Sequence, residues 1–185
     1  MRVISGTARG RRLKELPGMD TRPTTDKVKE SLFNIVQFDI EGRSVLDLFG
    51  GTGQLGIEAL SRGAARCTFV DMSRQAAAVI RENVKTVGFD HLSTVHQGDA
   101  AAFLAGCREK FDLIFLDPPY QSGLLERCIH EITKFDILAE HGIMICESAV
   151  ETQLPEAAAP YEKGREYRYG KIKLTVYRRQ GSVAL

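Results

Sequence analysis

The chain has 185 residues, of which 43% are apolar and 26% charged, so it is long enough for one well-packed domain and short for two. It lacks both an apolar run of about 18 residues and an apolar segment behind its basic N-terminus, which excludes a membrane span and a secretion signal. The four cysteines are widely spaced and form no C-x-x-C pair, as is typical of buried thiols in a reducing compartment. We therefore expect a cytoplasmic protein without a metal site.

The net charge of +1 conceals an uneven distribution. Residues 1–30 hold eight Lys and Arg against four Asp and Glu, a net charge of +4, and residues 161–185 hold seven against two, a net charge of +5. Residues 31–160 hold ten against eighteen, a net charge of −8. This asymmetry favours a polyanion-binding surface assembled from the two ends. The alternative is that these charges only form solvated faces.

The first 16 residues predict a small β-hairpin appended to a core that spans residues 24–180, the whole chain forming a single domain. Polar and apolar residues alternate around Gly6 and Gly10, and no acidic residue occurs before Glu15. Lys and Arg in such a segment favour contact with phosphates. The candidate RNA-binding residues are Arg2, Arg9, Arg11, Arg12, Arg22 and Lys27.

From Ser44 onward the pattern alternates between short apolar runs and helical segments. Predicted strands near 45–49, 67–70, 93–96, 113–116 and 143–146 are separated by helices that begin near 55, 73, 100 and 124. An earlier helix is expected after a cap at Thr25 or Asp26, and Ser73 can cap another. Continuously apolar strands between single helices indicate a parallel sheet covered on both faces. Residues 165–178 alternate like an antiparallel hairpin.

A glycine-rich turn follows the first predicted strand of the core. Gly51, Gly53 and Gly56 satisfy the G-x-G-x-x-G pattern, and Asp71 stands where an acidic ribose ligand belongs. Asp47 lies inside the apolar run, where an unpaired carboxylate is costly, so it should have a partner. This turn is also compatible with a purely structural role or with a nicotinamide-dependent oxidoreductase.

Four acidic residues follow or end four consecutive predicted strands. They are Asp47, Asp71, Asp99 and Asp117. Ligands of open parallel sheets bind outside the carboxyl ends of the strands, so the group favours a binding site, although each acid alone could be a helix cap. Asp117 opens the sequence Asp117-Pro118-Pro119-Tyr120, for which a hydride-transfer enzyme has no need.

These motifs resemble the S-adenosylmethionine-dependent methyltransferases with a Rossmann-like sheet. More narrowly, Arg2-Val-Ile-Ser-Gly6, Gly10-Arg11, residues 22–34 and Tyr169-Gly170 resemble the RsmD family over nearly the whole chain. The resemblance implies an α/β fold with a mostly parallel seven-stranded sheet, helices on both faces and an antiparallel C-terminal hairpin. The implied cofactor-binding residues are Asp47, Phe49, Gly50, Gly51, Gly53, Asp71, Met72, Asp99, Ala100 and Asp117. One departure is Gly50, where the family commonly has alanine, which should loosen the turn slightly.

The resemblance further implies methylation of the exocyclic N2 of a guanine in 16S ribosomal RNA, within a protein-bound small subunit, by a monomer that uses S-adenosylmethionine and releases S-adenosylhomocysteine. The implied catalytic residues are Asp117, Pro118 and Tyr120. The Asp117 carboxylate and the Pro118 carbonyl can accept hydrogen bonds from an amino group, and Tyr120 can stack on a base swung out of its helix. A DNA adenine-N6 methyltransferase and a non-catalytic RNA-binding module remain as alternatives.

Overall fold

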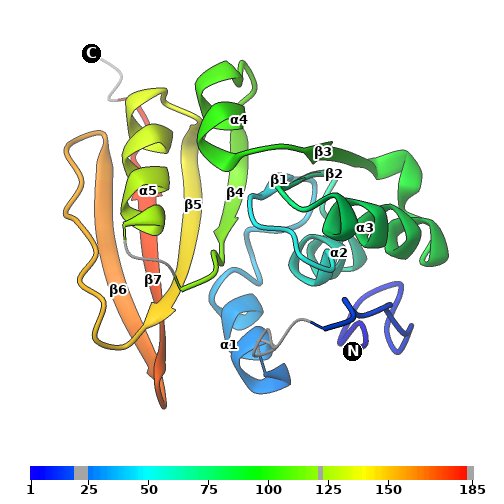
Figure 1. Ribbon diagram of the computed structural model, residues 1–185. Coiled ribbons are helices and arrows are strands. Elements are labelled where there is room, and N and C mark those ends of the chain that lie inside the picture. Colours follow the sequence, from blue (N-terminus) through cyan, green and yellow to red (C-terminus); the bar gives the residue numbers. More distant parts are fainter. Residues whose placement is uncertain (19–24, 121–122, 183–185) are drawn as a thin grey trace.

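The computed structural model describes residues 1–18, 25–120 and 123–182, and within them the strands form one seven-stranded sheet in the order β3-β2-β1-β4-β5-β7-β6 (Figure 1). Strands β1 to β5 run parallel, and β7 pairs antiparallel with both β5 and β6. The strands are β1 Ser44–Asp47, β2 Arg66–Asp71, β3 Ser93–Gln97, β4 Phe111–Leu116, β5 Leu138–Ala149, β6 Tyr161–Tyr169 and β7 Ile172–Arg179. The mostly parallel sheet and its antiparallel end are as predicted.

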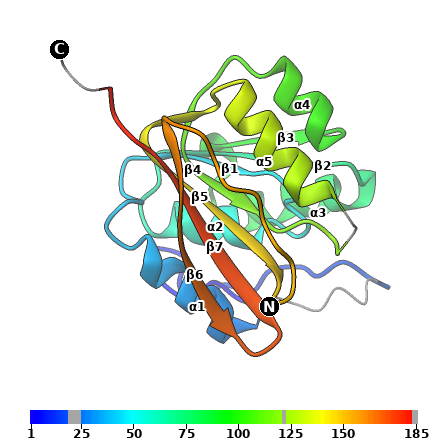
Figure 2. The same ribbon diagram turned by 90° about the vertical axis from the view of Figure 1, so that its left-hand side faces the viewer.

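Helices cover both faces of this sheet. They are α1 Asp26–Ile35, α2 Gln54–Ser61, α3 Arg74–Thr86, α4 Ala100–Gly106 and α5 Leu124–Lys134, with a short 3-10 turn, η1, at Asp90–Leu92. Seen from the β6 edge, α1 and α2 lie on one side of the sheet and α4 and α5 on the other (Figure 2). No helix in the described part of the chain is both long and apolar enough to cross a bilayer.

Each face of the sheet has its own hydrophobic cluster. Val45 of β1 belongs to the cluster that includes residues of α1, α2 and α3, whereas its neighbour Leu46 belongs to the cluster that includes residues of α4 and α5. Successive side chains of a strand point to opposite faces, so a strand covered on both sides is apolar at every position. This explains why the predicted strands were continuous apolar runs.

The helices begin at the predicted capping residues. The Thr25 hydroxyl accepts a hydrogen bond from the Val28 amide at 3.4 Å, and the Ser73 hydroxyl accepts one from the Ala76 amide at 3.2 Å. Such bonds satisfy amide groups that have no partner within the helix. The two predicted caps are confirmed: Thr25 fixes where α1 begins, and Ser73 fixes where α3 begins just after β2.

Strand β5 is much longer than its predicted apolar stretch of 143–146. Its first residues include Glu140 and His141, which interrupt the apolar pattern and are exposed. The pairing with β4 is also irregular there, shifting register between Phe111 and Leu113. Periodicity therefore predicted only the part of the strand that is buried on both faces.

The N-terminal segment, residues 1–14, folds back on itself through a single antiparallel bridge, between Arg2 and Arg12. The ladder is shorter than the predicted hairpin because the amides of Ile4 and Ser5 donate instead to the carboxylate of Glu58 in α2, each at 2.9 Å. The segment thus pairs with a helix side chain as much as with itself.

The same Glu58 forms a buried ionic cluster. Its carboxylate lies 3.1 Å from the Lys29 ammonium of α1 and 3.0 Å from Nε of Arg62, and the side chains of Lys29 and Glu58 are almost fully inaccessible. A charge at such depth requires partners, and here the backbone amides of the N-terminal segment complete the set. The cluster holds α1, α2 and the N-terminal segment together.

Candidate functional site

The glycine turn, residues 50–53, connects β1 to α2. Gly51 and Gly53 have φ values of 58° and 82°, and Gly53 is the residue that precedes the first turn of α2. The Gly53 amide also donates to the Gly50 carbonyl at 2.7 Å. Because these φ values are unfavourable for residues with a Cβ, the turn requires glycine at Gly51 and Gly53. The predicted strand, turn and helix are confirmed.

Gly50 is packed tightly against α3. A Cβ at this position would lie 2.7 Å from Cδ1 of Ile80, too close for unmoved neighbours. Ile80 thus occupies the space that an alanine methyl group would need. The side chain of Ile80 therefore packs directly against Gly50. This close packing contradicts the expectation that glycine loosens the turn at this position.

Asp47, the last residue of β1, is buried and accepts a hydrogen bond from the Gly56 amide at 3.0 Å, which supplies the predicted partner. Burial raises the pKa of Asp47 to about 8, and the nearby carboxylates of Asp117 and Asp71 contribute smaller increases. Three strand-end acids therefore lie close enough to repel one another. A cationic ligand at this edge would relieve that repulsion, so the acids fit the sulfonium and ammonium charges of S-adenosylmethionine.

Asp71, the last residue of β2, joins the ends of three strands. Its Oδ2 accepts from the Gly51 amide at 2.9 Å, its Oδ1 accepts from the Ser73 amide at 2.8 Å, and its backbone carbonyl accepts from the Gly98 amide at 3.0 Å. The carboxylate thereby fixes the glycine turn relative to α3. The next side chain, Met72, is 73% exposed at this edge and offers an apolar surface.

Asp99 and Ala100 follow β3 at the same edge. The Asp99 carboxylate accepts from the Ala102 amide at 2.9 Å and caps α4, while Ala100 is buried at the start of that helix. Asp99 is therefore the cap of α4, and it lies beside the end of β2, whose last residue, Asp71, accepts from the Gly98 amide. The described residues hold no group of three or more His, Cys, Asp and Glu side chains arranged to ligate a metal ion.

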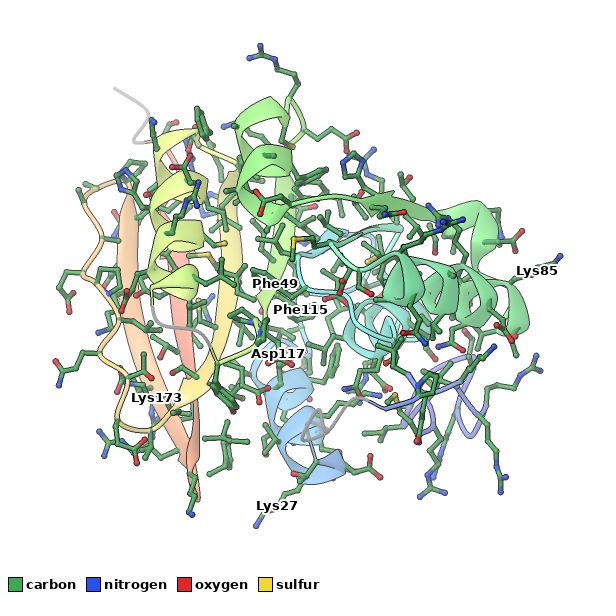
Figure 3. All side chains as sticks on the ribbon, viewed as in Figure 1. Lys27, Phe49, Lys85, Phe115, Asp117 and Lys173 are labelled. Atoms are coloured by element: carbon green, nitrogen blue, oxygen red, sulfur yellow. The ribbon has the colours of Figure 1, made fainter. Side chains whose placement is uncertain are left out.

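Asp117 follows β4, which is the neighbour of β1. Asp47 pairs with Phe115, and the Leu48 amide donates to the Phe115 carbonyl at 3.2 Å, so Asp117 comes just after the last paired residue. Phe49, Phe115 and Asp117 lie together near the centre of the molecule, where β1 and β4 end (Figure 3). The glycine turn and the start of Asp117-Pro118-Pro119-Tyr120 are therefore adjacent.

A pocket of about 310 Å³ opens beside this motif. Its walls come from the segment after β4 and from the end of β5, and Tyr120 is 62% exposed at its side. The lining residues are Pro118, Pro119, Tyr120, Gly123, Leu125, Glu126, Glu147, Ser148, Ala149 and Thr152. The pocket has the mixed polar and apolar walls expected of a site that takes a planar ring.

A larger hollow of about 370 Å³ lies between the end of β5 and strands β6 and β7. Its cations are already paired, since the ammonium groups of Lys173 and Lys163 lie 2.9 Å and 3.7 Å from Oε1 of Glu166. Of the seven Lys and Arg in residues 161–185, four take part in ion pairs: Lys163, Arg168, Lys173 and Arg179. More than half of these C-terminal cations thus already have an acidic partner, and the smaller pocket beside Tyr120 is the better candidate for a substrate.

The arginines of the N-terminal segment are differently placed. Arg2, Arg9, Arg11 and Arg12 are all exposed, and Arg11 donates to the Thr86 carbonyl at 2.6 Å. Within the described ranges, none of these four forms an ion pair, which leaves their charge available to an anionic ligand.

Two other candidate RNA-binding residues were expected near the start of α1. Lys27 is exposed and extends from α1 away from the body of the molecule, below Asp117 in the view of Figure 3. Phe33 of the same helix packs edge-on against Phe115 with 5.6 Å between ring centroids, which places α1 beside the end of β4. Arg22 lies outside the described residues.

Sequence reasoning missed Asn83, a buried polar residue on α3. It falls on the apolar face of that helix, three residues after Ile80 and one before Val84, and its side chain contacts both the glycine turn and the N-terminal segment. An amide among apolar residues requires hydrogen-bond partners, so its position in the helical pattern was the signal that could have found it.

Comparisons with known proteins agree along nearly the whole chain. The family model described as conserved hypothetical protein 95 matches residues 1–178. Ribosomal RNA small subunit methyltransferase D of Escherichia coli (strain K12) is 36% identical over 180 residues, covering 97% of this chain and 90% of that protein. YlbH of Bacillus subtilis (strain 168), provisionally named an rRNA methyltransferase, is 42% identical over 184 residues, 98% of this chain and 100% of that one. The solved structure of yhhF from Escherichia coli has a TM-score of 0.87 at 35% identity, covering 97% and 98% of the two chains.

Proposed function

Since the chain belongs to the RsmD family of methyltransferases, represented by the model for conserved hypothetical protein 95, we propose that it methylates the exocyclic N2 of a guanine in the 16S ribosomal RNA of the small subunit. The methyl donor is S-adenosylmethionine. The supporting observation is the adjacency of two features at the carboxyl edge of the sheet: the glycine turn with Asp47 and Asp71, and the Asp117-Pro118-Pro119-Tyr120 motif beside its pocket.

In this proposal, residues at different strand ends bind different parts of the donor. Asp71 holds the Gly51 amide and leaves its outer edge toward the ribose, and the exposed Met72 covers one side of the adenine. Asp99 and Ala100 border the adenine from β3, and Phe49 with the glycine turn lies under the methionine part. Asp47 and Asp117 border the methionine part of the donor, whose sulfonium would supply the activated methyl group.

The acceptor is held by the motif after β4. The guanine amino group is a poor nucleophile because its lone pair is delocalised into the ring. Asp117 and the Pro118 carbonyl accept hydrogen bonds from the amino hydrogens, which favours a pyramidal nitrogen with its lone pair directed at the methyl group. Pro118 and Pro119 restrict the backbone so that this carbonyl keeps its direction. Tyr120 stacks on the base after it leaves its helix.

The RNA backbone lies along the N-terminal segment and α1. The exposed Arg2, Arg9, Arg11 and Arg12 contact phosphates, as do Lys27 and Arg22. Such contacts supply affinity and orientation, whereas the pocket beside Tyr120 selects the base. We propose that a monomer acts on RNA within a protein-bound small-subunit assembly.

The decisive experiment is transfer of a labelled methyl group from S-adenosylmethionine to small ribosomal subunits that lack the native modification, followed by nucleoside analysis. Label in N2-methylguanosine is expected. Label in N6-methyladenosine, or transfer to duplex DNA without transfer to subunits, would contradict the guanine-N2 proposal and leave only a methyltransferase of another specificity.

A further inference from the structure

Asn83 of α3 contacts two segments that are far apart in the chain. Its side-chain oxygen accepts from the Lys14 amide at 2.7 Å, and its side-chain nitrogen donates to the Lys14 carbonyl at 3.0 Å and to the Thr52 carbonyl at 2.8 Å. Thr52 lies in the middle of the glycine turn. The amide group of one buried side chain, 1% exposed, therefore connects the N-terminal segment directly to that turn.

The three hydrogen bonds use most of the donors and acceptors of an asparagine side chain. Both amide hydrogens and one lone pair of the oxygen are engaged, so the side chain has little freedom to rotate without losing a partner. A buried amide that loses a partner is costly, which ties the position of Lys14 to that of Thr52. The link is reinforced by the Thr52 hydroxyl, which lies 3.3 Å from the sulfur of Met1.

The N-terminal segment is also held to α3 by its charged side chains. Arg11 donates to the Thr86 carbonyl at 2.6 Å, and the Lys14 ammonium lies 2.7 Å from Oε2 of Glu82. These two contacts are on the surface, where such interactions are weak individually. Asn83 thus makes the buried contact between α3 and the N-terminal segment. Of the side chains of Arg11, Lys14 and Asn83, only that of Asn83 is also hydrogen-bonded to the glycine turn.

We propose that Asn83 is a positioning residue that couples RNA binding to cofactor binding. The inference rests on the proposed function, in which the N-terminal arginines bind RNA and the glycine turn binds S-adenosylmethionine. RNA that immobilises the N-terminal segment fixes Lys14, and through Asn83 it fixes the Thr52 carbonyl and the turn. Cofactor bound to the turn fixes the N-terminal segment by the same route.

Such coupling must be reciprocal. If RNA raises the affinity for the cofactor by some factor, the cofactor raises the affinity for RNA by the same factor. Coupling between sites is commonly about 5-fold to 150-fold. One link of three hydrogen bonds should lie at the lower end, so we expect about 5-fold to 10-fold.

The test measures the Kd of S-adenosylhomocysteine by equilibrium dialysis, with and without saturating unmodified small ribosomal subunits. The ratio of the two values is the coupling factor. It is compared among the wild-type protein, Asn83→Ala and the near-isosteric Asn83→Asp. The Asp variant keeps the acceptor for the Lys14 amide but loses the donor to the Lys14 and Thr52 carbonyls. Glu82→Gln is the matched control, because it removes the surface ion pair of Lys14 and leaves Asn83 in place.

We expect the coupling factor to fall below about 2 in both Asn83 variants and to persist in Glu82→Gln. Thermal melts followed by circular dichroism identify a variant that does not fold. If Asn83→Ala does not fold, the coupling factor of Asn83→Asp is the test of the proposal. An unchanged factor in a folded Asn83 variant would reduce Asn83 to a structural role and overturn the inference. Independent binding of both ligands to the wild-type protein would also overturn it, whereas failure of the wild-type protein to bind either ligand would contradict the proposed function itself.

Discussion

The Gly51 amide donates a 2.9 Å hydrogen bond to Oδ2 of Asp71, so the carboxylate at the end of β2 sets the conformation of the turn after β1. Asp71→Ala should weaken binding of S-adenosylhomocysteine by about 10-fold to 100-fold, because a hydrogen bond to a charged group contributes about 1.5–3 kcal/mol. Isothermal titration calorimetry measures the loss. Asp112→Ala, at the amino end of β4, is the control and should leave the affinity unchanged. Equal affinities for wild type and Asp71→Ala would remove Asp71 from the cofactor site.

Replacing Arg9, Arg11 and Arg12 by alanine should weaken binding to small-subunit RNA and flatten its dependence on salt. Each lost phosphate contact lowers the slope of log K against log salt by about 0.7, so the triple variant should lose about 2. Filter binding over a range of salt concentrations measures this slope. The control removes the same charge at the amino edge of the sheet, from Arg43, Arg66 and Arg108. If both triple variants change the slope alike, the RNA surface is not the N-terminal segment.

Asp117→Asn should lower kcat at least about 100-fold while changing the affinity for S-adenosylhomocysteine less than about 5-fold, because an amide group presents a weaker acceptor to the amino group of the base. Single-turnover methyl transfer and calorimetry give the two numbers. Comparable losses in both would indicate that Asp117 serves the donor or the fold and not the acceptor.

Tyr120 is 62% exposed, so its substitution should not change the free energy of unfolding noticeably. Tyr120→Phe keeps an aromatic face and should retain most activity, whereas Tyr120→Ala should lower kcat/KM about 5-fold to 150-fold, since stacking on one base contributes about 1–3 kcal/mol. The comparison separates stacking from hydrogen bonding by the hydroxyl group. A Phe variant as impaired as the Ala variant would assign the role to the hydroxyl instead.

The buried Asp47 should make stability depend on pH. Burial raises its pKa from 3.8 to about 8, so the folded chain keeps a proton that the unfolded chain has already released. The free energy of unfolding should therefore fall as pH rises from about 4 to about 8, by about 1–4 kcal/mol relative to Asp47→Asn, which carries no titrating group there. Urea unfolding without cofactor at both ends of this range measures the difference. A gap between the two proteins that does not vary with pH would contradict the prediction.

The sequence predicted the strand ends well because apolar runs end where strands leave the core. The sequence alone therefore predicts that Asp47, Asp71, Asp99 and Asp117 lie at one edge, and the caps at Thr25 and Ser73 follow from local chemistry. The full length of β5 did not follow, because its exposed start carries no apolar period. Contacts between distant parts of the chain were also missed.

Glu58 and Asn83 illustrate that second limit. Both are polar residues on helical faces that are otherwise buried, and the sequence marks them only as exceptions to the apolar pattern. Both have among their partners backbone groups of the N-terminal segment more than 50 positions away, since Ile4 lies 54 residues from Glu58 and Lys14 lies 69 residues from Asn83. No local rule specifies which backbone group will meet a given side chain, so these contacts required the folded structure.

The buried ionic cluster around Glu58 bears on how shortened forms of this protein should be interpreted. Removing residues 1–16 would take away the Ile4 and Ser5 amides that solvate the Glu58 carboxylate, and it would uncover Lys29 and the apolar contacts of Val3. If a shortened chain failed to methylate RNA, disrupted packing between α1 and α2 would explain the lost activity as well as the missing arginines would. Surface substitutions that keep the backbone of the segment in place are the sounder route to its function.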